Sequence, residues 1–454
     1  MIVPGGDQIG GEMRSGGEFD PPEENVDIPR RILSGASLVL PDRVLVADLL
    51  VEGGSLIGVA PAGQGESRAV WSSPRSRPAE IWDVSGHTIL PGLIDMHTHG
   101  GWGIDFSRAS SEEILGTVEK YASVGVTRFL VTLVPSPLPE LEAQLAAAAT
   151  ACQQHRAFLG IHLEGPFLCR DRRGALPEAG IVPYSSETFE RLRLAANGFL
   201  RVMTFAPEAV PAEEIPRIRA AGVHLSIGHT SADAATTQRA IDAGVERATH
   251  LCNAMPPLHH REPGPLLPIL RDHRVRAEVI VDGEHVCDEM IDLALQLKGR
   301  EGIFAVSDSM PLAVAPGETP PVEELEFAGA WVRREEGRAV NTDGVLAGSV
   351  THLLPALERR MRARLSESTD LRSTSLCGLV ELGATVPAAD LRMTSTGRLA
   401  RNTCADLVIV RGEPRALVED AAVSITNNIV ATIRRGERAD AVDAPFLPDS
   451  LRRQ

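Results

Sequence analysis

Short apolar runs alternate with amphipathic segments through the middle of the chain. Eight such runs occupy residues 88–97, 126–134, 157–164, 200–208, 222–229, 247–250, 276–283 and 302–308. Helix-type patterns separate most of them, for example SEEILGTVEKYASVG at 111–125 and DAATTQRAIDAG at 233–244. Buried parallel strands are nearly continuous apolar runs, and a helix usually carries the chain from one strand to the next. Eight such units in series predict a (β/α)₈ barrel of the TIM type.

The two ends of the chain share a different pattern. Residues 32–60 contain short runs of alternating apolar residues between glycine turns, and residues 396–414 and 421–437 have the same texture. Such segments favour short strands, and we expect the two ends to pair. The sequence therefore predicts a small β-sandwich domain from 31–88 and 385–440, around a barrel at 89–384. Residues 1–30 are rich in glycine and acidic groups, which predicts a disordered tail.

Length, composition and charge narrow the class of protein. The 454 residues are 43% hydrophobic, enough for a barrel with an accessory domain. Acidic residues outnumber basic ones by 61 to 45, which argues against nucleic-acid binding. No run approaches the roughly 20 apolar residues that span a membrane, and the start lacks the apolar region of a signal peptide. The six cysteines form no CxxC pair, so we expect reduced thiols in a cytoplasmic protein.

Metal-binding side chains stand where several of the predicted barrel strands end. They are His97 and His99 after the first run, Glu164 in the third, His229 in the fifth, His250 in the sixth and Asp308 in the eighth. The carboxyl ends of barrel strands converge on one mouth, where the active sites of such barrels lie. We therefore expect these residues to meet, although they are distributed over nearly half of the chain.

The residue types predict hydrolysis at a divalent metal ion. In His97-Thr98-His99 the two imidazoles are two positions apart, so on a strand they point to the same side. Histidine and carboxylate ligands hold Zn²⁺ or a similar ion with a position left open for water. Asp308 is placed to accept a proton from that water and to pass it to a leaving amine. Taken singly, Glu164 could be a buried carboxylate bonded to backbone amides, and Asp308 a helix cap.

Six motifs carry a family resemblance. In this order, PGLIDMHTHG, GIHLEGPFL, SIGHT, THLCNAMPPLHHREPG, VSDSM and LAGS resemble the N-acetylglucosamine-6-phosphate deacetylase family of the amidohydrolase superfamily, over about residues 32–435. The resemblance implies a metal-dependent hydrolase that removes acetate from the nitrogen of an amino-sugar phosphate. It implies that Glu164, His229 and His250 hold the main ion, taken to be Zn²⁺. His97 and His99 leave room for a second ion, and Asp308 is the implied acid/base residue.

The resemblance also implies a set of substrate-binding residues. They are Asn253, Ala254, Arg261, His285, Leu346, Ala347 and Gly348. Asn253 and Ala254 would bind the sugar phosphate, and Arg261 would reach the phosphate in the neighbouring subunit of a homodimer. An arginine beside backbone amides suits an anion in an otherwise acidic protein. The alternative is that Arg261 pairs with an acidic residue on its own surface.

One position departs from the family pattern. In RRGALPEAG, Leu176 stands where the family has a histidine that contacts the acetyl carbonyl. Leucine cannot donate a hydrogen bond, which leaves open a different N-acyl amino sugar or another N-acyl amine. Amidohydrolases with a carbamylated lysine are disfavoured, because Lys120 and Lys298 are the only lysines and both lie in helix-like segments. A non-catalytic protein on the same fold is disfavoured because the candidate ligands and Asp308 are all present.

Overall fold

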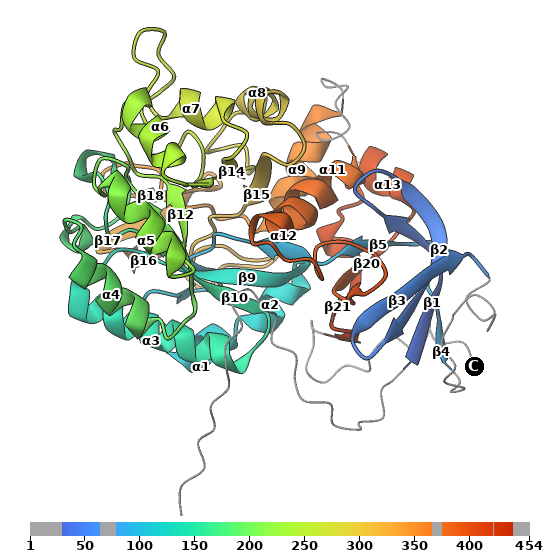
Figure 1. Ribbon diagram of the computed structural model, residues 1–454. Helices are drawn as coiled ribbons and strands as arrows, with labels where there is room; N and C mark the ends of the chain where they lie inside the picture. Colours follow the sequence, from blue (N-terminus) through green and yellow to red (C-terminus); the bar gives the residue numbers. More distant parts are fainter. Residues whose placement is uncertain (1–29, 64–78, 366–374, 421, 439–454) are drawn as a thin grey trace, which may run out of the picture.

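A parallel β-barrel forms the larger part of the molecule (Figure 1). The computed structural model describes residues 30–63, 79–365, 375–420 and 422–438. Eight strands pair in chain order. They are β6 (Leu93–Asp95), β9 (Val126–Leu133), β10 (Phe158–Glu164), β11 (Leu200–Phe205), β12 (His224–Ile227), β13 (Arg247–Ala248), β14 (Arg276–Ile280) and β15 (Ile303–Val306). A parallel bridge between Thr98 and Ser309 joins the extensions of the first and last strands. The predicted barrel and its eight strands are confirmed.

Helices on the outside of the barrel follow the strands in turn. They are α1 (Ser111–Leu115), α2 (Val118–Ser123), α3 (Leu138–Gln154), α4 (Ser186–Ala195), α5 (Ile215–Ala220), α6 (Ala234–Asp242), α7 (Leu266–Arg271), α8 (Asp288–Lys298) and α9 (Leu353–Arg364). Residues 111–125, predicted as one helical segment, form two short helices. Ser110 and Glu113 cap the start of α1 reciprocally, and Gly116 ends it. Glycine is a poor helix former, which explains the break at this position.

The two ends of the chain pair in one nine-stranded sheet, at the right in Figure 1. The first segment supplies β1 (Arg30–Val39), β2 (Val44–Glu52), β3 (Ser55–Pro61), β4 (Glu80–Asp83) and β5 (His87–Pro91), and the second β19 (Thr403–Cys404), β20 (Leu407–Arg411), β21 (Ile429–Arg434) and β22 (Glu437–Arg438). β5 lies between β1 and β20, so the expected pairing of the two ends is confirmed. The exact domain limits stay a prediction, and the predicted tail, except Arg30, lies outside the described residues.

A single residue separates this sheet from the barrel. Gly92 stands between β5 and β6, and its N–H donates to the Asp406 carbonyl at 2.8 Å. A Cβ at this position would lie 2.2 Å from the Thr127 hydroxyl oxygen, so only glycine allows the close approach. The strand that leads into His97 and His99 is therefore a direct continuation of the small sheet.

A three-stranded antiparallel sheet between β15 and α9 was not predicted. It consists of β16 (Glu324–Phe327), β17 (Ala330–Glu335) and β18 (Arg338–Asn341). Phe327, Val332 and Ala339 pack in one apolar cluster with Leu176 and Met310. Met310 lies just beyond the carboxyl end of β15, so this sheet packs beside the mouth of the barrel.

The opposite end of the barrel is closed by a helix from the last third of the chain. The elements there are α11 (Leu376–Val380), a π-helical turn (Glu381–Thr385) and α12 (Val386–Asp390), whereas α13 (Pro414–Glu419) follows β20 and contacts α9. Val386 and Ala388 of α12 pack against Ile94 and Phe304 inside the barrel. No helix in the described part of the chain is long and apolar enough to cross a membrane.

Candidate active site

Three of the predicted ligands converge on one point at the mouth of the barrel. Glu164 is the last residue of β10, while His229 and His250 each lie two residues beyond β12 and β13. Glu164 Oε1 lies 3.0 Å from His229 Nε2 and 2.9 Å from His250 Nε2, and the two nitrogens are 3.1 Å apart. All three side chains are buried. These three residues therefore lie together, as the sequence predicts.

The proton on His229 shows what this cluster suits. His229 Nδ1 lies 2.8 Å from the Arg172 carbonyl, which can only accept, so Nδ1 carries the proton. In the neutral ring the lone pair is then on Nε2, and it points at Glu164 and His250. Lone pairs and a carboxylate at about 3 Å repel one another unless a cation lies between them. Two imidazole nitrogens and one carboxylate oxygen are a donor set typical of catalytic zinc sites. The residues thus fit a divalent metal ion.

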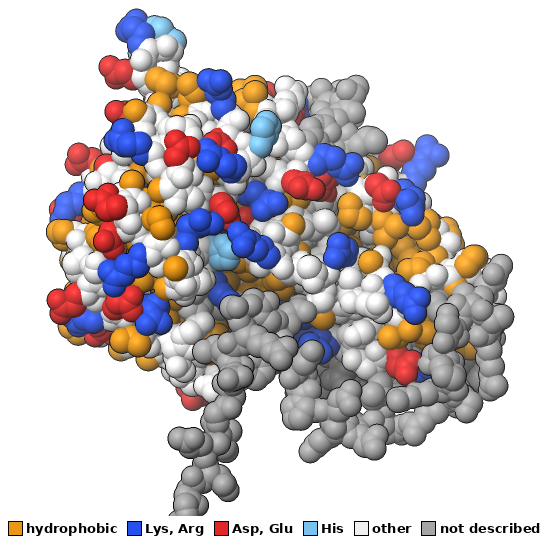
Figure 2. All heavy atoms as spheres, in the orientation of Figure 1, with side chains coloured by type: hydrophobic (Ala, Val, Ile, Leu, Met, Phe, Trp, Pro, Cys, Tyr) orange, Lys and Arg blue, Asp and Glu red, His pale blue; other side chains and the backbone are white. Residues whose placement is uncertain are grey.

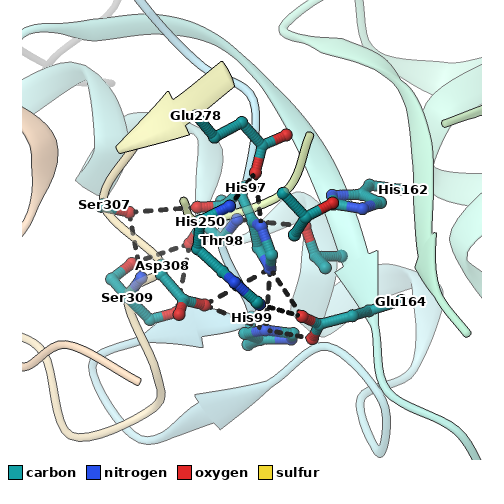
Figure 3. Close-up of polar contacts among 12 residues, drawn as sticks. His97, Thr98, His99, His162, Glu164, His250, Glu278, Ser307, Asp308 and Ser309 are labelled. Atoms are coloured by element: carbon teal, nitrogen blue, oxygen red, sulfur yellow. Dashed lines mark hydrogen bonds and ion pairs between the residues drawn. The ribbon is translucent and has the colours of Figure 1, made fainter. Parts of the chain in front are cut away.

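A second set of donors adjoins the first and shares Glu164 with it (Figure 3). His97 Nε2 and His99 Nε2 are 3.2 Å apart, and Glu164 Oε2 lies 3.2 Å from His99 Nε2. Asp308 Oδ1 faces both rings, at 3.3 Å from His97 and 3.2 Å from His99. Glu164 and Asp308 therefore approach the histidine pair from different sides, and Glu164, which belongs to both donor sets, would be a ligand for an ion in either of them.

Charges in this cluster are strongly coupled. Burial alone would raise the pKa of Glu164, but His97, His229 and His250 outweigh it and hold the pKa well below its usual value. Burial is likewise outweighed at Asp308, whose pKa is lowered by His97 and His99. The two carboxylates in turn overcome burial at His99 and raise its pKa to about 9. The site thus holds ionised carboxylates that favour positive charge, and a bound metal ion would displace protons from the histidines.

The backbone is unusual at three of these residues. His229, His250 and Asp308 have φ angles of 47°, 27° and 49°, in the left-handed region that non-glycine residues rarely adopt. Such conformations cost on the order of 1–3 kcal/mol each and cluster at functional sites. In each case the turn directs the side chain from the strand end into the mouth, which is a physical reason for the cost.

Hydroxyl groups behind the histidine pair hold together the extensions of the first and last barrel strands. The Thr98 hydroxyl lies 2.6 Å from the Tyr121 hydroxyl and 2.7 Å from the Ser309 hydroxyl, and all three side chains are buried. Thr98 separates His97 from His99, and Ser309 follows Asp308. These bonds hold the two strand ends that carry the histidine pair and the acid/base candidate.

His285 and the segment 346–349 lie together beside Asp308. His285 Nδ1 lies 2.8 Å from Asp282 Oδ2, and Nε2 lies 2.8 Å from the Ala347 carbonyl. Both partners are acceptors, and Asp282 raises the pKa of His285 although burial opposes the rise. A Cβ on Gly348 would lie 2.6 Å from the Asp308 carbonyl oxygen, so only glycine lets the segment come this close. Leu346 is bridged to Val340 of β18.

Asn253 and Ala254 lie three and four residues after His250. The Asn253 side-chain amide donates to the His250 carbonyl at 3.3 Å, and the Ala254 carbonyl accepts from the Thr230 N–H at 3.2 Å. The turn therefore connects the two histidine-bearing loops, since Thr230 follows His229. Asn253, Ala254, His285, Ala347 and Gly348 all lie next to residues of the ligand cluster, but their contact with a substrate stays a prediction.

Arg261 is placed differently. It lies in the loop between β13 and α7, which projects from the barrel at the upper left of Figure 1 and carries Lys/Arg and His side chains at its tip in Figure 2. Residues 257–262 are exposed. Arg261 Nη1 contacts His260 Nε2 at 2.8 Å, and among the described residues Arg261 forms no ion pair with a carboxylate. The alternative of a surface ion pair therefore finds no support here.

Leu176 lies in an apolar wall beside the histidine pair. Its side chain is 5% exposed and packs in the cluster of Met310 and Phe327, whose ring centre is 5.7 Å from that of His99. The Leu176 loop also supplies the Arg172 carbonyl that holds His229. The wall offers no hydrogen-bond donor from Leu176, and what it contacts in a substrate stays a prediction.

Several buried polar residues around the site were not predicted. Glu278 and Arg247 lie inside apolar runs, and His162 lies two residues before the end of another. A lone acidic residue in RAEVI and a lone basic residue in RATH are the only signals the sequence offers. Such residues are rarely buried without a partner, so opposite charges in consecutive predicted strands could have suggested a buried ion pair.

Comparisons with known proteins identify the family to which the chain belongs. A profile of the Amidohydrolase family matches residues 88–439. The N-acetylglucosamine-6-phosphate deacetylase of Bacillus subtilis (strain 168) is 33% identical over 323 residues, which cover 69% of this chain and 80% of that protein. The N-acetylgalactosamine-6-phosphate deacetylase of Shewanella sp. (strain ANA-3) is 30% identical over 336 residues, covering 74% and 82%.

A solved structure shares the fold over nearly the whole length. A mutant N-acetyl-D-glucosamine-6-phosphate deacetylase from Mycobacterium smegmatis, in complex with N-acetyl-D-glucosamine-6-phosphate, superposes with a TM-score of 0.77 at 26% identity. The match covers 91% of this chain and 100% of that one. Fold and ligand cluster define a barrel hydrolase with a divalent-metal site, and the chain belongs to the amidohydrolase family. The resemblance found in the sequence is confirmed.

Proposed function

We propose that this protein hydrolyses the N-acetyl amide of N-acetylglucosamine 6-phosphate, giving glucosamine 6-phosphate and acetate. The observation that carries the proposal is the buried cluster in which Glu164 joins two histidine pairs, with Asp308 within 3.3 Å of one pair. Relatives with this activity match most of the chain, and the Bacillus subtilis enzyme is 33% identical over 69% of it. The reaction is hydrolysis of a linear amide C–N bond.

The chemistry divides between an ion and one carboxylate. A divalent ion held by Glu164, His229 and His250 would supply a Lewis acid that polarises the amide carbonyl and acidifies water. Asp308 accepts the proton that water loses as its oxygen bonds to the carbonyl carbon. Asp308 then gives that proton to the amine nitrogen as the C–N bond breaks. Water thus supplies the oxygen of acetate, and its proton leaves on the amine.

The metal is proposed to be Zn²⁺, with one or two ions in each subunit. Histidine nitrogens and carboxylate oxygens are the usual ligands of this ion in hydrolases. His97 and His99 would provide donors for a second ion, and Glu164 is common to both donor sets. We also place the protein in the cytoplasm, and its six free cysteines are consistent with a reducing compartment.

The phosphate end of the substrate is proposed to bind Asn253, Ala254 and His285, beside the wall formed by Leu346, Ala347 and Gly348. Arg261 completes the site from the neighbouring subunit of a homodimer. An arginine on a projecting loop, with no carboxylate partner among the described residues, is suited to this role.

The outer surface also supports an interface with a second copy. Leu258 on the projecting loop is 43% exposed. On α8, Leu293 and Leu297 are 40% and 44% exposed, and they lie one helical turn apart on the same face. The two leucines of α8 thus form a small exposed apolar patch, a feature typical of protein interfaces.

A second substrate is favoured by two observations. The Shewanella relative at 30% identity is an N-acetylgalactosamine-6-phosphate deacetylase, and the apolar Leu176 leaves the acyl end without the family's histidine. The alternative is therefore a different N-acyl amino sugar or another N-acyl amine. A non-catalytic protein is disfavoured, because all five candidate ligands converge.

Acetate release by the purified protein tests both substrates. The panel is N-acetylglucosamine 6-phosphate, N-acetylgalactosamine 6-phosphate, and N-acetylglucosamine without phosphate. Fastest turnover of the first is expected. Faster turnover of the second would replace the proposed substrate by its epimer, and equal turnover of the unphosphorylated sugar would refute a phosphate site. No turnover of any of them by zinc-loaded protein would refute the proposed activity.

A further inference from the structure

A chain of buried charges crosses the barrel interior and ends on a candidate metal ligand. Starting from α12, Asp390 Oδ2 accepts from Arg247 Nη1 at 2.6 Å. Arg247 Nε and Nη2 donate to Glu278 Oε1 at 3.0 and 2.6 Å, and Glu278 Oε2 lies 3.0 Å from His97 Nδ1. The Arg247 guanidinium also covers the Phe304 ring at 5.0 Å. Each member is at most 7% exposed.

We infer that Glu278 is a positioning residue, held by Arg247, that fixes the proton of His97 on Nδ1 and so keeps Nε2 free for a metal ion. The inference rests on the proposed metal centre and adds two residues that lie outside the predicted ligand set. Glu278 contacts His97 at Nδ1, and Arg247 contacts Glu278, so neither residue lies on the side of His97 that faces a substrate. Figure 3 shows Glu278 on the side of His97 away from Glu164.

The hydrogen-bonding capacity of each group carries the argument. Ionised Glu278 can only accept, so His97 Nδ1 must donate to it. The neutral ring then has its lone pair on Nε2, which points at His99 Nε2 at 3.2 Å and Asp308 Oδ1 at 3.3 Å. A carboxylate that orients a metal-binding histidine in this way also raises its basicity, and losing it typically weakens metal affinity about 10- to 100-fold.

Arg247 explains why Glu278 stays ionised in the barrel interior. Its guanidinium donates to Glu278 Oε1 from Nε and Nη2, at 3.0 and 2.6 Å, and its positive charge offsets the burial of the carboxylate. The Arg247–Glu278 ion pair also argues against a third metal site. His97, His162 and Glu278 bring donor atoms within 4.8 Å of one another. A cation there would meet the guanidinium that already contacts Glu278 Oε1 at 2.6 Å, so the charges repel.

Glu278 also touches the other donor set. The His250 backbone N–H lies 3.4 Å from Glu278 Oε2, and the Leu251 N–H donates to the Glu278 carbonyl at 2.8 Å. One residue of β14 therefore contacts a ligand from each set, His97 through its ring and His250 through its backbone. The stronger contact is with His97, and the effect of removing the carboxylate should be largest there.

The substitution Glu278→Gln separates a positioning role from simple packing. A glutamine has the same shape but one acceptor and one donor group. Arg247 presents two donors, so the amide oxygen turns to Arg247 and the NH₂ group turns to His97. Nδ1 must then accept, the His97 proton moves to Nε2, and the ligand lone pair is lost. The opposite rotamer would put the NH₂ group against the guanidinium.

Zinc binding is the first measurement. Metal-free wild-type protein, Glu278→Gln and Glu246→Gln are titrated with Zn²⁺ against a chromophoric chelator, and His99→Asn marks the ion that the histidine pair holds. We expect Glu278→Gln to lower the affinity of that ion about 10- to 100-fold. Glu246→Gln is the matched control, since Glu246 precedes Arg247 but pairs outward with Arg219 and Arg392. Wild-type affinity in Glu278→Gln would overturn the inference.

The His97 proton itself is the second measurement, and it moves only for a positioning role. In protein with ¹⁵N-labelled histidine, recorded with and without Zn²⁺, the Nδ1–H signal of His97 is assigned by its absence in His97→Gln. We expect this signal in wild type and its loss in Glu278→Gln. An unchanged signal would overturn the inference even if zinc affinity fell.

Two results separate the inference from the proposed function. If wild-type protein binds no Zn²⁺, the proposed function fails, while the His97 N–H signal still reports on Glu278. Should Glu278→Gln not fold, Arg247→Lys is measured in its place. Lysine keeps a positive charge against Glu278, so we expect the His97 signal and zinc affinity to be kept. Loss of both with the fold intact would overturn the role given to Arg247.

Discussion

Replacing Asp308 by asparagine should remove turnover and keep the metal ion. Asparagine has nearly the same size, and it tolerates the left-handed backbone that Asp308 adopts at φ 49°. The substitution therefore adds little strain, whereas it removes the proton acceptor beside the histidine pair. Asp308 is not part of the donor set of Glu164, His229 and His250. A loss of general acid–base catalysis alone is about 10²- to 10⁴-fold.

That range corresponds to about 3–5 kcal/mol in the activation free energy. The structure argues for the upper part, because Asp308 is 8% exposed and little bulk water could replace it as a base. The assay compares kcat for acetate release with zinc content per subunit. Asp48→Asn is the matched control, since Asp48 is also buried but lies in the small sheet, bonded to Ser34 and Gly35.

Two results would refute this reasoning. Wild-type kcat with unchanged zinc content would mean that Asp308 carries no proton in the reaction. Loss of zinc together with activity would mean that Asp308 is needed to hold the ion rather than to move a proton. The control should keep both quantities, so a similar loss in Asp48→Asn would point to general damage to the fold.

Three further predictions follow from the site and the fold. Arg261→Ala should raise KM for the phosphorylated sugar by about 10-fold or more with kcat nearly unchanged. Arg415→Ala, an exposed arginine paired with Glu419, should change neither constant. Removing divalent ions with a chelator should abolish acetate release, and Zn²⁺ should restore it; activity that survives chelation would contradict the metal centre. Burial, together with Arg247 and Arg392, lowers the pKa of His224 to about 4. The unfolded chain, with an ordinary pKa near 6.5, binds more protons below that pH, so stability falls from pH 6.5 towards 4. His224→Gln should reduce the loss between pH 7 and 5 by up to about 2 kcal/mol in urea unfolding, and an unchanged loss would contradict it.

The barrel could be predicted because each of its strands has a recognisable local sequence pattern. Each is a short apolar run, and the polar residue at its end marks where the strand leaves the core, as Glu164 does for β10. Convergence of these ends then followed from the geometry of barrels rather than from any contact visible in the sequence. The small sheet was predictable for the same reason, since its strands alternate between glycine turns.

The parts that were missed depend on contacts between distant segments. β16–β18 is a sheet of short strands with charged residues on one face, and its few apolar positions find a partner only where Leu176 and Met310 lie. The break between α1 and α2 at Gly116 is one residue in an otherwise helical pattern. The bond of Glu278 to Arg247 joins β14 to β13, and only the folded barrel reveals that His97 lies on its other side.

The single residue between β5 and β6 has a practical consequence for dissecting the chain. The strand that ends in the histidine pair is anchored in the small sheet by five pairings of β5 with β20, near the end of the described residues. A shortened protein ending before residue 403 would leave β5 with an open edge and would release the anchor of His97 and His99. The barrel therefore cannot be excised as a minimal hydrolase, and affinity tags are better appended to the existing ends than used in place of the last strands.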